Sequence, residues 1–279
     1  MKQRILVAVV GVPALLLVLC VAPDWATGIL LSLLVIVGAH ELLAAVCSPD
    51  KAKRWFWLSA AMGVVTVWLT YIGHSRFAGS NIATGGLFLL AALVVAVFLL
   101  AAVEYGGRQT MTFQDICAVL VAGIVIPAAL SCLMRLRLLP YGGGLVLIPL
   151  VAAFCSDTMA LFTGMACGRH KLAPRLSPKK TVEGAVGGVL GGILGMVIFR
   201  IVFQMITLHA LNIVWCIVMG LVGAVMGQLG DLSFSLIKRE TGIKDYGRLL
   251  PGHGGVLDRF DSVIFAAPVI WLILSHVTM

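Results

Sequence analysis

Residues 235–261 read SLIKRETGIKDYGRLLPGHGGVLDRFD and concentrate charge in a chain that is otherwise largely apolar. The segment 250–255, with one proline and three glycines, cannot continue a regular helix. Asp258 and Asp261 follow it, three residues apart and so on one side of the next helix. Before the turn, polar residues at helical spacing share one helix face: Asp231, Ser235 and Lys238. Carboxylates and basic groups on both sides of a glycine-rich turn predict a site for metal ions and phosphates.

The composition on either side of this stretch indicates a membrane protein. The 279 residues are 61% hydrophobic and only 11% charged, with a mean hydropathy of +1.07. A soluble domain carries roughly a quarter charged residues. Apolar runs of about 20 residues recur along the chain, as transmembrane helices require. The sequence therefore predicts an all-α polytopic integral membrane protein.

We expect about nine transmembrane helices, and we expect the C-terminal ones to form a polar, cytosol-facing active-site cavity. Residues 1–140 would supply about five spans as a scaffold. Residues 141–279 would supply about four spans, with cytoplasmic loops that carry the catalytic motifs. The first span, at 5–22, is predicted to be a retained helix because no small-residue cleavage site follows it. The others are expected near 25–46, 55–72, 84–103, 112–134, 144–166, 184–208, 211–236 and 260–278.

The distribution of Lys and Arg gives the orientation. When the loops alternate between the two sides of the membrane, 16 of the 20 basic residues fall on the side of the N-terminus. The positive-inside rule makes that side cytoplasmic. The net charge of +8 is thereby explained without nucleic-acid binding. The absence of a transit-type N-terminus favours a bacterial plasma (inner) membrane.

Besides the spans that carry Asp231 and Asp261, the sixth and the second spans contain acidic residues that could be functional. Asp157 lies within an apolar helix, where a carboxylate is costly and usually marks a functional site; the alternative is a hydrogen-bonded packing residue. His40 and Glu41 lie near the cytoplasmic end of the second span. They are either functional or, more often for such pairs, an interfacial capping or packing pair. Glycines four apart in the spans at 184–208 and 211–236 predict close helix packing.

A basic loop precedes the seventh span. It contains Ser177, Lys179, Lys180 and Thr181 just before a helix start. Hydroxyls, ammonium groups and free N–H groups there can bind a phosphate. Composition alone leaves a second interpretation equally open, in which the loop binds lipid headgroups.

Four aspartates of this half belong to spans that meet the cytoplasmic face: Asp157, Asp231, Asp258 and Asp261. Grouped carboxylates without a cation would repel one another, and oxygen-only ligands favour Mg²⁺ or Mn²⁺ over zinc. His253, alone in the turn, suits a phosphate donor or a loop-ordering residue better than a metal ligand. A metal, a cytosolic polyanion and a bilayer together suggest nucleotide-dependent phosphoryl or nucleotidyl transfer onto a lipid.

The motif resembles that of the phosphatidate cytidylyltransferase (CDP-diacylglycerol synthase) family. The match covers the C-terminal half by motif and the N-terminal half only by its series of spans. Leu161 stands where members often have Tyr, so a hydroxyl contact there is in doubt. The fixed positions of the first stretch are Ser235, Ile237, Lys238, Arg239, Lys244, Asp245, Gly247, Leu250, Pro251, His253, Gly254, Gly255, Val256, Asp258, Arg259, Phe260 and Asp261. Those of the second include Ser156, Asp157, Thr158, Lys171, Leu172, Pro174, Leu176, Ser177, Pro178, Lys180, Thr181, Glu183 and Gly184.

The resemblance implies the reaction of CTP with phosphatidate to give CDP-diacylglycerol and pyrophosphate in phospholipid biosynthesis. It implies Asp231 and Asp258 as ligands of Mg²⁺, with a possible second cation, and a homodimer. Asp261 and Asp157 are expected to complete or orient the metal shell, and Lys238 is assigned to the catalytic group. The residues expected to bind substrate phosphates are Ser177, Lys179, Lys180, Thr181, Ser235, Arg239, Lys244, His253 and Arg259.

Three alternatives remain at this point. A cytidylyltransferase for an ether or isoprenoid lipid phosphate would share the headgroup chemistry. A CTP-dependent lipid kinase would transfer the γ-phosphate instead. An anion transporter would need a polar path through both leaflets, whereas the acidic residues here gather toward the cytosolic side.

Overall fold

The computed structural model describes residues 2–74, 80–107, 110–247 and 254–277. Within these residues, eight helices are long and apolar enough to cross a membrane, which confirms an all-α polytopic membrane protein. The span expected at 5–22 is divided between α1 (Lys2–Leu16) and a π-helical segment, η1 (Leu17–Val21). Besides these eight, the described residues contain a shorter apolar helix at Val9–Val21.

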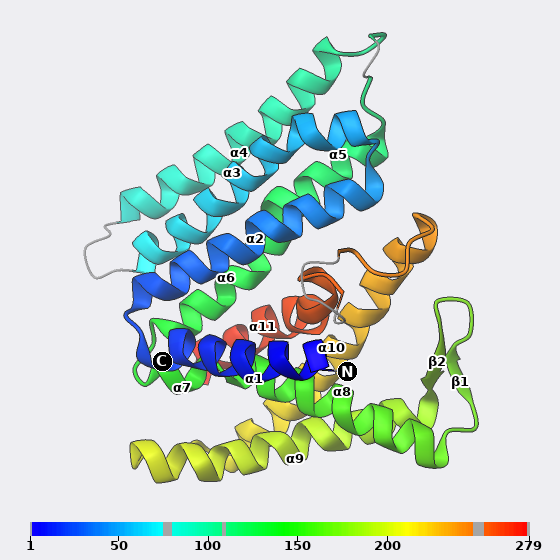
Figure 1. Cartoon of the computed structure of the whole chain (residues 1–279). Coiled ribbons are helices and arrows are strands. Elements are labelled where there is room, and N and C mark those ends of the chain that lie inside the picture. Colours follow the sequence, from blue (N-terminus) through cyan, green and yellow to red (C-terminus); the bar gives the residue numbers. More distant parts are fainter. Residues whose placement is uncertain (1, 75–79, 108–109, 248–253, 278–279) are drawn as a thin grey trace. The chain divides into compact units, whose positions relative to one another are not determined.

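The chain divides into two compact units, of which the first comprises Met1–Leu138 and Ile243–Arg259. Its helices α2, α3 and α6 pack against one another, and α4 packs on α3 (Figure 1). A capping box at Thr112 and Asp115 begins α5, which continues through a π-helical segment, η2, into α6. The helices of this unit, besides α1, are α2 (Asp24–Val46), α3 (Pro49–His74), α4 (Ser80–Val103), α5 (Phe113–Leu120), η2 (Val121–Val125) and α6 (Ile126–Arg137).

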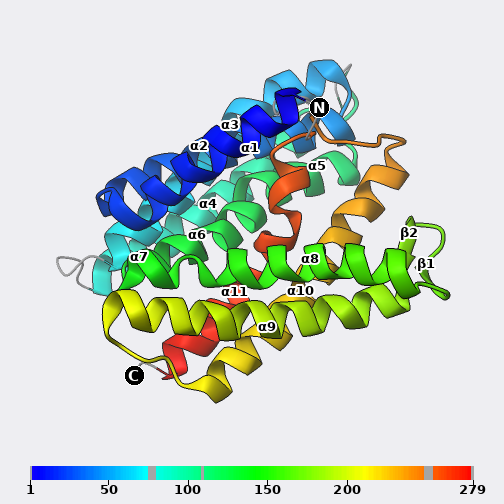
Figure 2. The same ribbon diagram turned by 60° about the horizontal axis from the view of Figure 1, so that its bottom comes forward.

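The second unit comprises Leu139–Gly242 and Phe260–Met279. Its helices α8 and α9 lie side by side, and a β-hairpin joins one end of α8 to the start of α9 (Figure 2). The boundary between the units falls within α11, after Arg259. The elements are α7 (Gly142–Leu145), α8 (Ile148–Cys167), β1 (Lys171–Ala173), β2 (Ser177–Thr181), α9 (Val182–Thr207), α10 (Ile213–Glu240) and α11 (Leu257–Val277).

The close helix packing predicted from the glycines is confirmed between α9 and α10. A Cβ added at Gly220 would lie 2.7 Å from Ile193 Cα and 2.8 Å from the carbonyl oxygen of Gly192. Since these neighbours are main-chain atoms, they cannot turn aside as a flexible side chain would. The two helices therefore touch backbone to backbone at this point, as small residues allow in membranes. The functional division predicted at residue 140 stays a prediction.

Candidate active site

Three aspartates of the second unit come together from three helices: Asp157 on α8, Asp231 on α10 and Asp261 on α11. The Ser262 hydroxyl joins two of them, its Oγ lying 3.2 Å from Asp157 Oδ2 and 3.3 Å from Asp261 Oδ1. The charges of Asp231 and Asp157 both act on Asp261, which is buried. Like charges this close in an apolar setting repel one another unless a cation or a proton neutralises them.

The approach of Asp231 to Asp261 depends on the glycine that precedes Asp231. A Cβ added at Gly230 would collide with the main-chain carbonyl oxygen of Asp261. A larger residue would therefore push α10 and α11 apart at the level of the carboxylates. Gly230 thus contributes to the site through the space it leaves.

Lysine side chains supply positive charge to this cluster. Lys180 Nζ, at the end of β2, lies 2.5 Å from Asp231 Oδ2. Lys238 lies on α10, and its charge acts on Asp261. Ser235, one turn after Asp231, places its Oγ 3.4 Å from Asp231 Oδ1. The structure thus brings together Lys180, Asp231 and Ser235, which the sequence assigned to phosphate and metal binding.

The basic loop expected before the seventh span forms a hairpin, which the sequence did not predict. Its strands are antiparallel, with Lys171 opposite Thr181 and Ala173 opposite Ser177. Arg239 of α10 donates from Nε to the carbonyl oxygen of Leu176, 3.0 Å away. This bond ties the turn of the hairpin to the end of α10, and so keeps Lys180 near Asp231.

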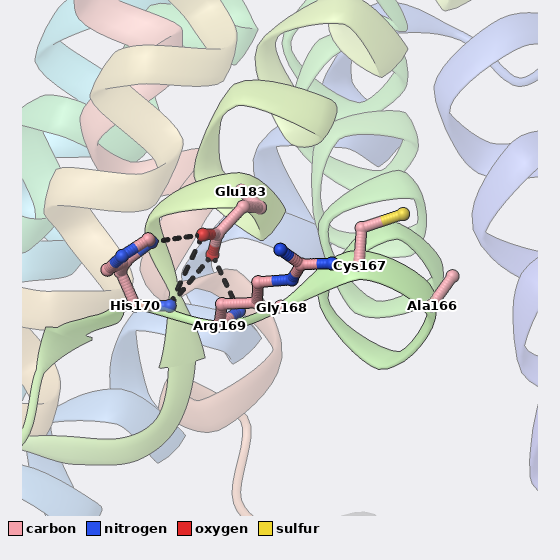
Figure 3. Close-up of a pocket in the computed structure, with 6 residues that line it drawn as sticks. All are labelled: Ala166, Cys167, Gly168, Arg169, His170 and Glu183. Atoms are coloured by element: carbon pink, nitrogen blue, oxygen red, sulfur yellow. Dashed lines mark hydrogen bonds and ion pairs between the residues drawn. The ribbon is translucent and has the colours of Figure 1, made fainter.

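Two hairpin residues have structural partners that the sequence did not reveal. The Thr181 hydroxyl accepts a hydrogen bond from Gly184 N at 3.1 Å and caps the N-terminus of α9. Glu183 accepts from the main-chain N–H groups of Arg169 and His170, and its Oε1 lies 2.6 Å from His170 Nδ1 (Figure 3). These bonds close the base of the hairpin.

A hollow of about 550 Å³ opens beside the hydrogen bonds that Glu183 makes with Arg169 and His170. None of its lining residues was predicted as a site residue, and its one carboxylate, Glu183, already accepts three donors. We therefore assign this hollow to the hairpin base and not to the carboxylate cluster. It is lined by Ala166, Cys167, Gly168, Arg169, His170 and Glu183 (Figure 3).

In the first unit, Asp258 organises the turn that contains most of the motif. Its Oδ2 accepts hydrogen bonds from Tyr246 N at 2.8 Å and from Gly255 N at 3.0 Å. Gly254 adopts a φ of 86°, a left-handed conformation that favours glycine. Lys244 and Arg259 are exposed on the same segment. Asp258 therefore holds together main-chain segments on both sides of residues 248–253.

His40 and Glu41 do not act as a pair. The His40 ring makes an edge contact with Phe56, at a centroid distance of 5.7 Å. Glu41 is buried and accepts hydrogen bonds from Val256 N and Leu257 N, both at 2.9 Å. The capping interpretation is thus correct for Glu41, whose partner is the start of α11.

Comparison with known proteins places the chain in a family. The model of the cytidylyltransferase family matches residues 2–277. The chain belongs to this family. A protein of Bacillus subtilis is 31% identical over 276 residues, covering 99% of this chain and 98% of its own length. One of Haemophilus influenzae is 32% identical, covering 96% of each chain, and one of Rickettsia bellii is 33% identical, covering 81% of this chain and 94% of its own length. All three are named phosphatidate cytidylyltransferase.

The family match extends the resemblance, which rested on motifs in the C-terminal half, to nearly the whole chain. The predicted site residues that the structure describes are distributed over the two units. His253 lies outside the described residues. In the first unit are Lys244, Asp258 and Arg259. In the second are Asp157, Ser177, Lys179, Lys180, Thr181, Asp231, Ser235, Lys238, Arg239 and Asp261.

The donor chemistry of the aspartate cluster suits a hard cation. Asp157, Asp231 and Asp261 present carboxylate oxygens, with the Ser262 hydroxyl between two of them, and Mg²⁺ prefers oxygen ligands. No three His, Cys, Asp or Glu side chains in the described part of the chain are grouped closely enough to coordinate one ion. The fit therefore rests on the type of ligand, and Mg²⁺ binding stays a prediction.

Proposed function

We propose that the chain is a phosphatidate cytidylyltransferase, which converts CTP and phosphatidate into CDP-diacylglycerol and pyrophosphate. The observation that carries this proposal is the cytidylyltransferase match over residues 2–277, together with relatives of that name along nearly the whole chain. The eight apolar helices agree with a substrate that resides in the bilayer. A role in phospholipid biosynthesis follows from the product.

The reaction requires little covalent help from the protein. A phosphatidate phosphate oxygen attacks the α-phosphorus of CTP, the bond from that phosphorus to the β-phosphate bridging oxygen breaks, and pyrophosphate leaves. The attacking phosphate is already ionised near neutral pH, so no strong general base is needed. Catalysis then consists of in-line positioning and neutralisation of charge.

The basic residues of the site would neutralise the substrate phosphates. We assign Lys180 and Lys238 to this role because their charges already act on the aspartate cluster. Arg239 combines phosphate binding with its bond to the hairpin turn. The remaining phosphate ligands are the other residues predicted from the sequence: Ser177, Lys179, Thr181, Ser235, Lys244, His253 and Arg259.

We propose Mg²⁺ as the cofactor, held by Asp231 and Asp258, with Asp157 and Asp261 completing or orienting its shell. Such an ion acts as a Lewis acid on phosphate oxygens and offsets their charge. In the structure, Lys180 neutralises Asp231. The Asp231 side chain is also 28% exposed, so part of its carboxylate remains open to a cation, which supports the assignment.

We further propose a bacterial plasma membrane location, with the N-terminus and the site loops cytoplasmic, and a homodimer. The orientation is supported by the excess of Lys and Arg on that side. Cytosolic CTP would then reach the residues that bind its phosphates without crossing the bilayer. The homodimer rests on the family resemblance alone.

The proposal is tested with purified protein in detergent, phosphatidate, Mg²⁺ and CTP labelled with ³²P at either the α or the γ position. We expect α-label in the lipid fraction, none of the γ-label there, and no lipid label when EDTA is present. Lipid labelled from γ-labelled CTP would show a kinase. Transfer to an isoprenoid phosphate in preference to phosphatidate would show the other lipid specificity.

A further inference from the structure

Glu41 is a buried acid of α2 whose recorded partners are main-chain donors far away in sequence. Its side chain is 3% exposed. Oε1 accepts from Val256 N and Oε2 from Leu257 N, each at 2.9 Å. These N–H groups lie at the N-terminus of α11, where the first turn of a helix leaves its donors without intrahelical partners. A carboxylate there also interacts favourably with the helix dipole.

The turn leaves space for this carboxylate. A Cβ added at Gly255 would lie 2.5 Å from both Glu41 oxygens, and one added at Gly247 would collide with Oε1. Neither glycine has a positive φ, so the requirement for glycine comes from contact with Glu41 and not from backbone conformation. Gly38, one turn earlier on α2, leaves room in the same way for Leu257, whose Cδ2 would be 3.2 Å from an added Cβ.

The residue next to this cap is Asp258. Glu41 fixes Val256 and Leu257, while Asp258 Oδ2 binds Gly255 N in the same turn. The two carboxylates therefore accept hydrogen bonds from three consecutive main-chain N–H groups. Asp258 accepts from Gly255 N, and Glu41 accepts from the N–H groups of the next two residues. Moving Val256 and Leu257 would carry the Asp258 carboxylate with them.

We propose that Glu41 is a positioning residue for cytidylyl transfer: it anchors the start of α11 and thereby sets the place of Asp258. This inference rests on the proposed function. Glu41 does not touch substrate in this role. It affects the rate through the position of the Asp258 carboxylate, because a displacement of about 1 Å can lower a rate by about a hundredfold.

Glu41→Gln tests the proposal because it keeps the side-chain shape but replaces one acceptor oxygen with an NH₂ group, which cannot accept from a main-chain N–H. We expect kcat to fall by about 10- to 100-fold, with the KM for CTP changed by less than about threefold. The matched control is Asp115→Asn. Asp115 is also a buried acid of the first unit that caps a helix, and it pairs with Lys51 at 2.7 Å. The Asp115→Asn variant should have a lower unfolding temperature, while its kcat per folded molecule stays within about twofold of the wild-type value.

A second pair of variants keeps the test decisive if Glu41→Gln does not accumulate. Gly255→Ala adds a methyl group against both Glu41 oxygens and should lower kcat. Glu41→Asp shortens the side chain by one methylene and so moves the carboxylate away from residue 255. In the double variant with Gly255→Ala, kcat should fall by less than the product of the two fold-decreases seen in the single variants.

The outcomes separate this inference from the proposed function. A wild-type chain that transfers no label contradicts the function itself. An active wild type in which Glu41→Gln keeps normal kcat, or loses no more than Asp115→Asn, overturns the positioning role. Multiplicative losses in the Gly255 and Glu41 pair would overturn it as well.

Discussion

At the scale of single residues, Lys180 forms an ion pair with Asp231. Its Nζ lies 2.5 Å from Asp231, and both side chains are about one quarter exposed, at 24% and 28%. An ammonium group in this position can neutralise either the aspartate or a substrate phosphate. We therefore expect Lys180→Ala to raise the KM for CTP by about tenfold, the loss of one charge-assisted hydrogen bond.

The measurement is the steady-state KM for CTP in detergent, with Lys171→Ala as control. Lys171 is an exposed lysine of the same hairpin, on the neighbouring strand. An equal rise in the KM for CTP in both variants would show that CTP binding depends on the total charge of the hairpin and not on the contact with Asp231. Loss of the Lys180→Ala protein from the membrane would show a structural role.

At the scale of elements, the contact between α9 and α10 holds the hairpin and Asp231 on one framework. Gly220→Ala would force a Cβ to 2.7 Å from Ile193 Cα, and overpacking of this kind costs about 1–3 kcal/mol. We expect a lower unfolding temperature, measured by tryptophan fluorescence in detergent. Gly11→Ala on α1 is the control, since nothing lies within 4 Å of its added Cβ. A Gly220→Ala protein as stable as this control would contradict the backbone contact.

The elements also show how far prediction from sequence extends. Hydropathy predicts the spans because a segment in lipid must be apolar and must form all of its backbone hydrogen bonds within its own helix. Asp157 and Asp231 are recognisable because charge is costly in an apolar helix. The hairpin is not recognisable, because strands of three and five residues with two prolines between and within them have no clear alternating pattern. The partner of Glu41 lies 215 and 216 residues away, and no local pattern encodes that contact.

At the scale of the whole molecule, the charge distribution predicts which side each loop occupies. Cys167 ends α8 beside the hairpin and is exposed. In a variant with Cys167 as the sole cysteine, we expect a membrane-impermeant maleimide to label inside-out vesicles and not intact cells. A sole cysteine introduced by Tyr141→Cys, at an exposed position between α6 and α8, should show the opposite pattern. Labelling of Cys167 in intact cells would reverse the proposed orientation.

The central claim is that the C-terminal aspartates carry Mg²⁺-dependent cytidylyl transfer, and Asp258→Asn tests it most directly. The Asn oxygen can still accept from Tyr246 N and Gly255 N, so the variant removes the charge while preserving the turn. The measurement is the turnover of CTP and phosphatidate across a Mg²⁺ titration, in protein with the unfolding temperature of the wild type. We predict a fall of about a hundredfold or more at every Mg²⁺ concentration. Near-normal turnover at saturating Mg²⁺ would contradict the claim.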